Sequence, residues 1–440
     1  MSPSVKLLAR ALLVATATVA SAFSARAGSE AIILVDVESG KVLQAENATY
    51  PWYPASTSKL MTTYVTLHAI KEGRIGFDTV FTVSPTAAAQ SPSKMGFRTG
   101  TQLTVDNALK MLLVHSANDM AVVLAEGVDG SIEKFADEMN ATSQRLGMTQ
   151  SSWVNPNGLP AEGQISSARD LAILARALIH DFPEWDFYWH IPAIKLGRRV
   201  MTNYNKLLAE YPGSDGMKTG FICSSGFNLV ATATRNNRRL IAIVLGAPSS
   251  AVRAAKAASL LERGFNGSML SWLLPSLGTV DALQPINAAP PDLHEQICGP
   301  HRKRPAAEDE DDDAAGTASN DPQRAFMLSD LKGATRGSLL TGNPLVAGVP
   351  ATVVYVGPKR DNPVANAADD AAMPTPAKPR RKKAKDVAKD TADKPAATKP
   401  ADKPADKPKA AAAKPSDAKP AQAKVTAAKP KTTPAPPTAQ

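Results

Sequence analysis

The sequence predicts an α/β (α+β) domain in which strands from the two ends of one globular segment form a common sheet. Apolar runs typical of strands occur early, at residues 31–37, and late, at residues 227–234 and 240–245. The interval between them is dominated by helical patterns with capping residues. A chain that begins and ends in strands and is helical in between places its terminal strands side by side and forms a helical subdomain.

Each strand follows from a local pattern. Residues 31–37 are an apolar run, Glu38-Ser39-Gly40 is a turn, and a returning strand begins at Lys41. The later runs are separated by Arg235-Asn-Asn-Arg238, so that they form a β hairpin. A shorter apolar run at 351–356 favours one more strand.

The helices follow from apolar spacing and from their end signals. We expect helices from about Ser56 to Lys71 with Gly73 as the stop, after the cap Thr104, after Asn118, over 170–179, and over 251–262 ending at Gly264.

Four segments divide the chain. Residues 1–27 are predicted to be a signal peptide, because a basic start and an apolar run precede Ala25-Arg26-Ala27, a small-x-small cleavage site. Residues 28–266 form the predicted catalytic domain, and 267–364 a linker or short, poorly defined C-terminal region that contains the acidic run 308–313. Residues 365–440 consist mainly of Ala, Lys, Pro and Asp and are predicted to be disordered, because they hold too little apolar area to offset the entropy of ordering.

The net charge of +9 belongs to the tail and not to the globular part. Residues 378–440 carry 17 Lys or Arg against 6 Asp, or +11, so the other 377 residues sum to −2. The charge therefore gives no reason to expect a nucleic-acid partner. Two interpretations of the tail stay open: contact with anionic lipid or cell-wall polymer, and a solvated spacer.

The signal peptide places the mature chain outside the cytoplasm, in the periplasm or on the outer face of the cytoplasmic membrane. Disulfides persist there. The two cysteines, Cys223 and Cys298, either form a bridge or remain thiols, and their spacing does not decide between these states.

The first chemical motif is Ser56-Thr-Ser-Lys59, at the start of a predicted helix. Residues three apart share a helix face, and a serine hydroxyl needs a base to become a nucleophile. A lysine can be that base if burial or a nearby cation lowers its pKa. The same spacing occurs four more times, and helix capping is the ordinary interpretation of such a serine, so this motif is weak alone.

Two further motifs occur once each. Ser116-Ala117-Asn118 lies between two helical stretches, and Lys218-Thr219-Gly220 lies at a predicted strand. Either motif alone is ordinary turn or strand-end chemistry. Ser-x-x-Lys, Ser-x-Asn and Lys-Thr-Gly in this order are the motif set of penicillin-binding proteins and class A β-lactamases.

With these motifs, residues 30–266 resemble the low-molecular-mass penicillin-binding proteins, the D-alanyl-D-alanine carboxypeptidases of serine peptidase family S11. The likeness extends to Asn155-Pro-Asn-Gly158, Ser166-Ser-Ala-Arg-Asp170 and Gly226-Phe-Asn-Leu-Val-Ala231. It implies a β-lactamase/transpeptidase-like fold with an antiparallel sheet. It also implies a hydrolase that removes the terminal D-alanine from peptidoglycan pentapeptide stems and is acylated by β-lactam antibiotics.

The resemblance also implies the role of each site residue. Ser56 is the nucleophile and Lys59 the general base, Ser116 and Lys218 pass the proton to the leaving amine, and Asn118 holds the amide of the acyl chain. The backbone N–H groups of Ser56 and of Phe221, which follows Gly220, bind the oxyanion. Thr219 and Arg253 bind the terminal carboxylate of the substrate.

Neither a cofactor nor a metal is expected, since the six histidines show no ligand spacing. Three other functions stay open: an endopeptidase for D-Ala cross-links, a β-lactamase, and a non-enzymatic wall-binding protein. Glu162 lies in the interval where a class A β-lactamase carries its deacylating carboxylate, but its surroundings match the peptidase pattern. The second domain and the C-terminal amphipathic helix of many family members have no clear match, so membrane attachment is undecided.

Overall fold

The computed structural model describes residues 30–267, 276–300 and 349–359. The predicted signal peptide, the acidic run 308–313 and the tail 365–440 lie outside these residues, and their predictions remain untested.

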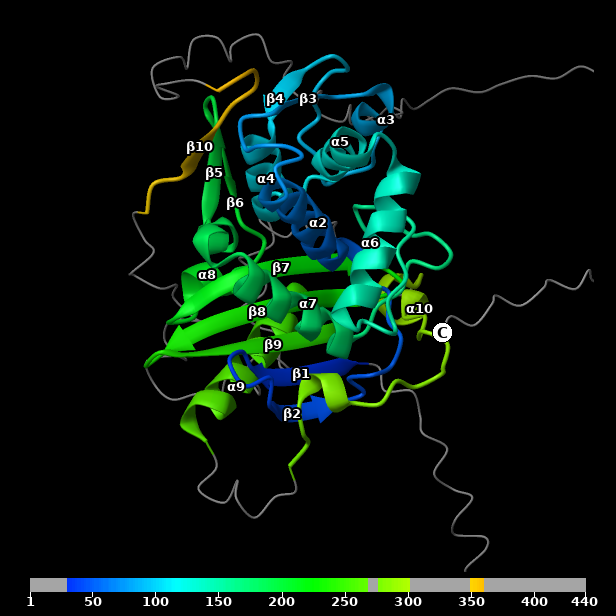
Figure 1. Ribbon diagram of the computed structural model, residues 1–440. Helices are drawn as coiled ribbons and strands as arrows, with labels where there is room; N and C mark the ends of the chain where they lie inside the picture. The colour runs from blue at the N-terminus through cyan, green and yellow to red at the C-terminus, as the bar shows by residue number, and fades with distance from the viewer. Residues whose placement is uncertain (1–29, 268–275, 301–348, 360–440) are drawn as a thin grey trace, which may run out of the picture. The chain divides into compact units, whose positions relative to one another are not determined.

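A five-stranded sheet in the order β2-β1-β9-β8-β7 forms the centre of the fold (Figure 1). All its pairings are antiparallel. The strands are β1 (Ala31–Asp36), β2 (Val42–Glu46), β7 (Ser214–Ile222), β8 (Gly226–Arg235) and β9 (Arg238–Ala247). Because β1 pairs with β9, the prediction that strands from the two ends share a sheet is confirmed.

The two faces of the sheet pack against different helices. On β9, Ile241 and Ile243 pack in the core shared with the helical subdomain. Ala242 and Val244 pack in a second apolar cluster under α9 (Ser250–Asn266). Side chains alternate across a strand, so a run that is apolar at every position fits a sheet covered on both faces.

The helical subdomain lies on the side of the sheet opposite α9 (Figure 1). Its principal helices are α2 (Lys59–Lys71), α4 (Val105–Val114), α5 (Asn118–Asp129), α6 (Ile132–Leu146) and α7 (Ala168–Asp181). The predicted end signals act as expected: Gly73 adopts a φ of 73° after α2, and the side chain of Thr104 accepts a hydrogen bond from the Asn107 amide at the start of α4.

Gly264 does not end α9 as predicted, because the helix continues to Asn266. A Cβ atom at Gly264 would lie 2.6 Å from a Leu240 methyl group and 2.9 Å from one of Leu34. The glycine therefore allows α9 to pack closely on the sheet, and Gly267 takes the capping position.

Several short elements had no sequence-based prediction. They are β3 (Val80–Thr82), α3 (Pro85–Ala88), β4 (Gln102–Thr104), η2 (Pro183–His190), β5 (Ala193–Leu196), β6 (Arg199–Thr202), α8 (Leu207–Glu210), η4 (Val280–Ala282) and α10 (His294–Cys298). Most span one turn or one short strand, too little for a periodic pattern to emerge. The first turn of the helix predicted from about Ser56 is instead a separate 3₁₀ helix, η1 (Ala55–Ser58), directly before α2.

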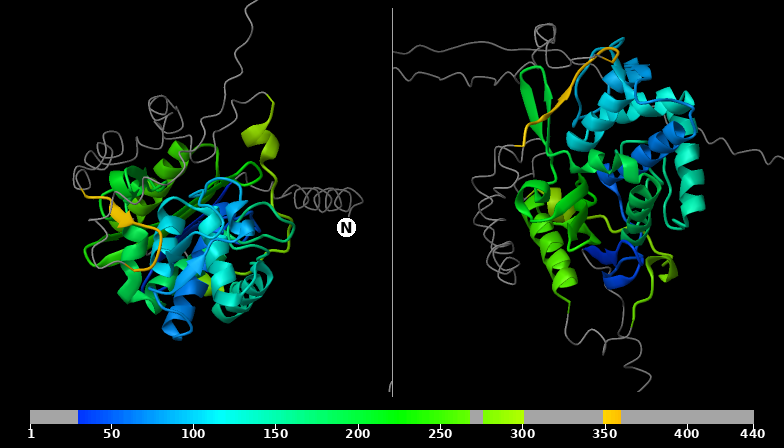
Figure 2. Two further views of the ribbon diagram at one scale, coloured as in Figure 1. Left: turned by 90° about the horizontal axis from the view of Figure 1, so that it is seen from above. Right: turned by 60° about the vertical axis from the view of Figure 1, so that its left-hand side comes forward.

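The described parts of the region 267–364 pack onto the rest of the fold. Cys223 and Cys298 form a disulfide, which joins the turn after β7 to α10. The expected late strand exists as β10 (Thr352–Val354) and pairs in parallel with β5, where it is drawn in orange beside the β5–β6 hairpin (Figures 1 and 2). Gly357 then bridges to Leu103 of β4.

Candidate active site

Ser56 lies in η1, one turn before α2 begins at Lys59. Its neighbour Ala55 has a φ of 49°, a left-handed conformation that non-glycine residues rarely adopt and that is found where the surroundings enforce it. No side chain caps η1 or α2 by a hydrogen bond. Helix capping therefore does not explain Ser56.

The strand β7 lies directly against the backbone that carries Ser56. A Cβ atom on Gly220 would lie 2.9 Å from the Ser56 nitrogen, 3.0 Å from the Thr57 nitrogen and 3.1 Å from the Pro54 oxygen. Only glycine permits this approach. The third motif thus contacts the first at Gly220.

The side-chain nitrogen of Lys59 is enclosed by three oxygen atoms. Its Nζ lies 2.8 Å from Ser56 Oγ, 2.7 Å from Asn118 Oδ1 and 2.6 Å from the Asn157 carbonyl oxygen, and the residue is fully buried. A neutral amine here can donate to the two fixed acceptors and still offer its lone pair to the Ser56 hydroxyl. This geometry suits a general base for Ser56.

The second motif joins α4 to α5. Asn118 begins α5 and donates from Nδ2 to the Ser91 carbonyl, 2.9 Å away. Ser116 is buried with a φ of 56°. Its Oγ has no hydrogen-bond partner among the residues that the structure describes. A buried hydroxyl left unpaired costs stability and is available to a substrate or a proton relay.

A loop next to Asn118 is fixed by a buried carboxylate. Asp119 accepts hydrogen bonds from the backbone amides of Met95, Gly96 and Met120. Burial raises the pKa of Asp119, and these amides oppose that rise. The loop they fix includes Ser93, whose carbonyl accepts from the Asn118 amide at 2.8 Å.

The third motif lies within β7, whereas Lys218 was predicted at a strand start. Lys218 and Gly220 share one face of the strand, so the buried Lys218 lies on the face that meets Ser56. Thr219 lies on the other face, opposite Leu229. Its Oγ1 is buried without a hydrogen-bond partner in the described part of the chain.

Arg253 lies in α9, on the face of the sheet toward which Thr219 points. It is buried, its Nη1 donates to the Asn228 carbonyl at 3.1 Å, and its guanidinium lies 5.7 Å from the centre of the Phe227 ring. The Phe227 ring stacks on Phe221, with centroids 4.2 Å apart. Arg253 and Thr219 thus lie on the same face of the sheet, the face opposite to Lys218 and Gly220, at the edge strand β7.

Sequence reasoning gave no role to two residues that the structure places at this site. Asn157 supplies the carbonyl that accepts from Lys59, and Asn228 links β8 to the segment before Ser56. Both lie in stretches that carry the family resemblance. An asparagine in each stretch was visible in the sequence. Its contacts with Lys59 or with the backbone before Ser56 could not be predicted, because they depend on tertiary structure.

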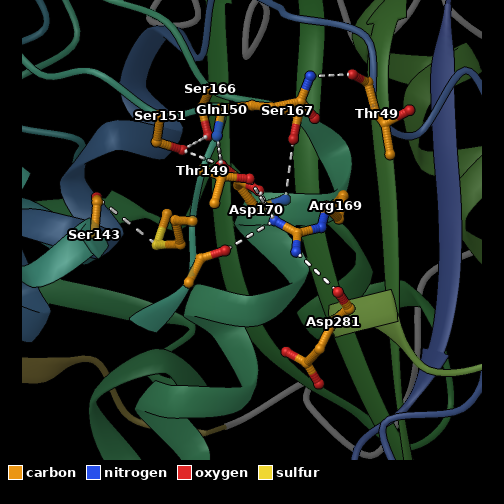
Figure 3. A network of polar contacts seen from close by, with 12 residues as sticks. Thr49, Ser143, Thr149, Gln150, Ser151, Ser166, Ser167, Arg169, Asp170 and Asp281 are labelled. Carbon is orange, nitrogen blue, oxygen red and sulfur yellow. Dashed lines mark hydrogen bonds and ion pairs between the residues drawn. The ribbon is translucent and has the colours of Figure 1, made fainter. Parts of the chain in front are cut away.

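The loop that contains Asn157 is anchored by the polar network drawn in Figure 3. Asp170 Oδ1 accepts from Arg169 Nη1 at 2.7 Å, and Oδ2 accepts from the Gln150 amide and the Ser151 hydroxyl, each at 2.8 Å. Arg169 also donates to the Asp281 carbonyl. Burial raises the pKa of Asp170, against the opposing effect of Arg169.

The described residues hold no group of three or more His, Cys, Asp or Glu side chains arranged for a metal ion. Within the same residues, no helix combines the length and apolarity that a membrane crossing requires.

Fold and site together define a serine–lysine protein of the penicillin-binding type. The family model described as D-alanyl-D-alanine carboxypeptidase, Peptidase_S11, matches residues 16–249. Because this match covers more than half of the chain, the protein belongs to that family, and the resemblance seen in the sequence is confirmed.

Curated relatives support the same family. The chain is 38% identical over 244 residues to D-alanyl-D-alanine carboxypeptidase DacC of Escherichia coli K12, a match that covers 54% of this chain and 61% of the relative. It is 33% identical over 242 residues to DacF of Bacillus subtilis, covering 54% and 62%. The chain thus spans about three fifths of the length of these relatives.

Solved structures agree with the fold. Penicillin binding protein 5 from Haemophilus influenzae matches with a TM-score of 0.52 and 35% identity, over 54% of this chain and 70% of that one. Penicillin binding protein 6B from Escherichia coli matches with a TM-score of 0.52 and 36% identity, over 54% and 77%. The predicted fold class is confirmed.

Proposed function

We propose that this protein is a serine-type D-Ala-D-Ala carboxypeptidase that releases the terminal D-alanine of peptidoglycan pentapeptide stems through an acyl-enzyme at Ser56. The observation that carries the proposal is the position of Lys59 Nζ. It lies 2.8 Å from Ser56 Oγ and is held there by Asn118 and Asn157.

In the proposed first half-reaction, Ser56 Oγ attacks the carbonyl carbon between the two D-alanines while its proton passes to Lys59 Nζ. The negative charge that develops on the carbonyl oxygen is bound by the backbone N–H groups of Ser56 and Phe221. The contact of Gly220 with the Ser56 backbone supports this role, because it brings the two segments together.

The C–N bond then breaks, and the D-alanine amine leaves with a proton relayed through Ser116 and Lys218. The buried, unpaired Ser116 hydroxyl supports its place in this relay. Water next attacks the ester, the proton returns to Ser56, and the shortened stem is released. Asn118 holds the amide of the acyl chain throughout.

Recognition of the free carboxylate falls to Thr219 and Arg253. The buried, unpaired Thr219 hydroxyl and the buried Arg253 guanidinium lie on the same face of the sheet at the edge strand β7. A guanidinium suits a carboxylate because its donors match the two oxygens. We extend the proposal to β-lactam antibiotics as covalent inhibitors, since they acylate the same nucleophile.

The decisive experiment compares the wild type with Ser56→Ala on a pentapeptide muropeptide and on labelled penicillin. The wild type should release free D-alanine and become labelled, and Ser56→Ala should do neither, with a loss of at least about 10³-fold in hydrolysis. Ser143→Ala is the control: its buried hydroxyl accepts from Trp153 Nε1, so it should lose about 1 kcal/mol of stability and keep activity. Labelling that persists in Ser56→Ala would refute the nucleophile.

The products separate the remaining functions. Resolved dimers without free D-alanine would indicate the endopeptidase, and rapid turnover of penicillin would indicate a β-lactamase. Glu162, the one residue that favoured a β-lactamase, is exposed. A wild type with neither product nor label would indicate a wall-binding protein.

We also propose that the protein is exported and acts in the periplasm or on the outer face of the cytoplasmic membrane, from the predicted signal peptide. Removing residues 366–440 should leave hydrolysis of a small D-Ala-D-Ala peptide unchanged, because no described site residue belongs to that segment. A large loss would place the tail in the catalytic unit.

A further inference from the structure

The segment 53–57, which delivers Ser56, must be held against the sheet although its own backbone is strained. Ala55 has a φ of 49°. A side chain on Gly158 would collide with the Ala55 carbonyl oxygen, so the loop at Gly158 closes on one side of the segment. A conformation of this kind persists only where neighbouring groups enforce it.

Asn228 supplies such a group from the sheet. Its Nδ2 donates to the carbonyl oxygens of Tyr53, at 2.9 Å, and Pro54, at 3.3 Å. Its Oδ1 accepts from the Gly246 amide of β9 at 3.1 Å. The residue is fully buried, so one side-chain amide fastens the segment before Ser56 to two central strands.

The register of the sheet makes this contact specific to the site. Asn228 lies directly opposite Gly220, and directly opposed residues point to the same face of a sheet. Gly220 has no side chain, and a Cβ atom there would lie 2.9 Å from the Ser56 nitrogen and 3.0 Å from the Thr57 nitrogen, so the absence of a side chain leaves room for the segment. Asn228 therefore reaches the segment beside Gly220, where the proposed oxyanion donors must be spaced.

We propose that Asn228 is a positioning residue that fixes the spacing between the Ser56 amide and β7, and with it the geometry of Ser56 acylation. The inference rests on the proposed acyl-enzyme. Substitutions of the Asn228 side chain should affect acylation but not recognition of the substrate carboxylate. Arg253 contacts the backbone carbonyl of Asn228, and this carbonyl remains in place when the side chain is changed.

The test uses Asn228→Asp, which keeps the size and the acceptor for Gly246 but loses both N–H donors, and Asn228→Ser as a second, uncharged variant. Acylation by penicillin and kcat for a D-Ala-D-Ala peptide should fall about 100-fold, as for a nucleophile displaced by about 1 Å. KM for the peptide should change less than about threefold. Arg253→Ala should have the opposite effect. It should raise KM for the D-Ala-D-Ala peptide by a larger factor than it lowers the rate of acylation by a small probe.

Thr232→Val is the matched control. Thr232 is fully buried on the same strand and the same face, and its Oγ1 has no hydrogen-bond partner in the described residues. This variant should acylate at the wild-type rate. Equal losses in Thr232→Val and the Asn228 variants would show a general packing effect and overturn the proposal.

A readout independent of activity keeps the two proposals distinguishable. Hydrogen exchange of the amides at residues 55–57, compared with those in β9, should accelerate at least tenfold in folded Asn228 variants. Unchanged exchange and acylation in a folded Asn228→Asp would overturn the positioning role. A wild type that releases no D-alanine and binds no penicillin would overturn the proposed function, while the exchange result still decides the role of Asn228.

Discussion

Two buried polar clusters of this fold differ in how their polar atoms are satisfied by hydrogen bonds. In the network around Asp170, both carboxylate oxygens accept hydrogen bonds from the chain itself (Figure 3). Within the three motifs of the proposed site, the hydroxyls of Ser116 and Thr219 are buried without a partner among the described residues.

The Asp170 network also contains unpaired atoms, Arg169 Nε and Gln150 Oε1. The same side chains are nevertheless anchored by hydrogen bonds, which Arg169 Nη1 and Gln150 Nε2 donate. The hydroxyl is instead the one polar side-chain atom of Ser116 and of Thr219.

A buried unpaired group costs about 1–3 kcal/mol. The fold bears this cost at Ser116 and Thr219, which belong to the three motifs, and also at Thr232, outside them. An unpaired hydroxyl therefore points to a ligand only together with its place in the motif set. The chain itself completes the hydrogen bonds of the Asp170 carboxylate, as expected of a structural network, whereas the motif hydroxyls of Ser116 and Thr219 remain available to a ligand.

The strongest test of this contrast is Ser116→Ala. Removing an unpaired hydroxyl should leave the free energy of unfolding within about 0.5 kcal/mol of the wild type or raise it. Loss of the proposed proton relay should slow D-alanine release about 10²- to 10⁴-fold. Denaturant titration and a D-alanine assay measure the two effects. A clear loss of stability with full activity would assign Ser116 to the scaffold.

The Asp170 network should show the opposite pattern. Asp170→Asn places an amide against Arg169 and the Gln150 amide, and should lower the free energy of unfolding by about 3 kcal/mol, read from the denaturant midpoint. Activity per folded molecule should stay within a few-fold of the wild type. The control is Asp281→Ala: this exposed side chain pairs with Arg176 at 3.8 Å, and its loss should cost less than about 1 kcal/mol. A large activity loss in a stable Asp170→Asn would place the network in the site.

A third polar cluster, around Asp186, makes a contribution to stability that depends on pH. Burial favours the neutral form of Asp186, but His190 and Arg239 outweigh it and lower the pKa from 3.8 to about 2. A lowered carboxyl pKa stabilises the fold above the unfolded-state value and loses that contribution as the pH falls toward 2. Asp186→Asn should therefore destabilise by about 1 kcal/mol at pH 7, and the difference should shrink between pH 4 and 2. Thermal unfolding across that range measures it, and a difference independent of pH would contradict the assignment.

The sequence predicted the sheet and the longer helices where periodicity was strong, as in residues 31–37 and in the helix capped by Thr104. It missed α6, although Ser131 caps it by accepting from the Lys134 amide. It also misread Gly264 as a stop, because a glycine that permits close packing and a glycine that ends a helix look alike in one dimension. The sequence also left the disulfide undecided. The two cysteines are 75 residues apart, and this spacing does not show whether they lie close together in the fold.

The sequence by itself determined the order of the three motifs, and with it the family and the residue types that the chemistry requires. Tertiary structure decided that Gly220 lies against Ser56, that Asn157 and Asn228 support the site through carbonyl contacts, and that Ser116 and Thr219 remain unpaired. The physical reason is that motifs identify side chains, which sequence records directly. Distances between segments, and the partners of backbone groups, arise only when strands and helices from distant parts of the chain pack together.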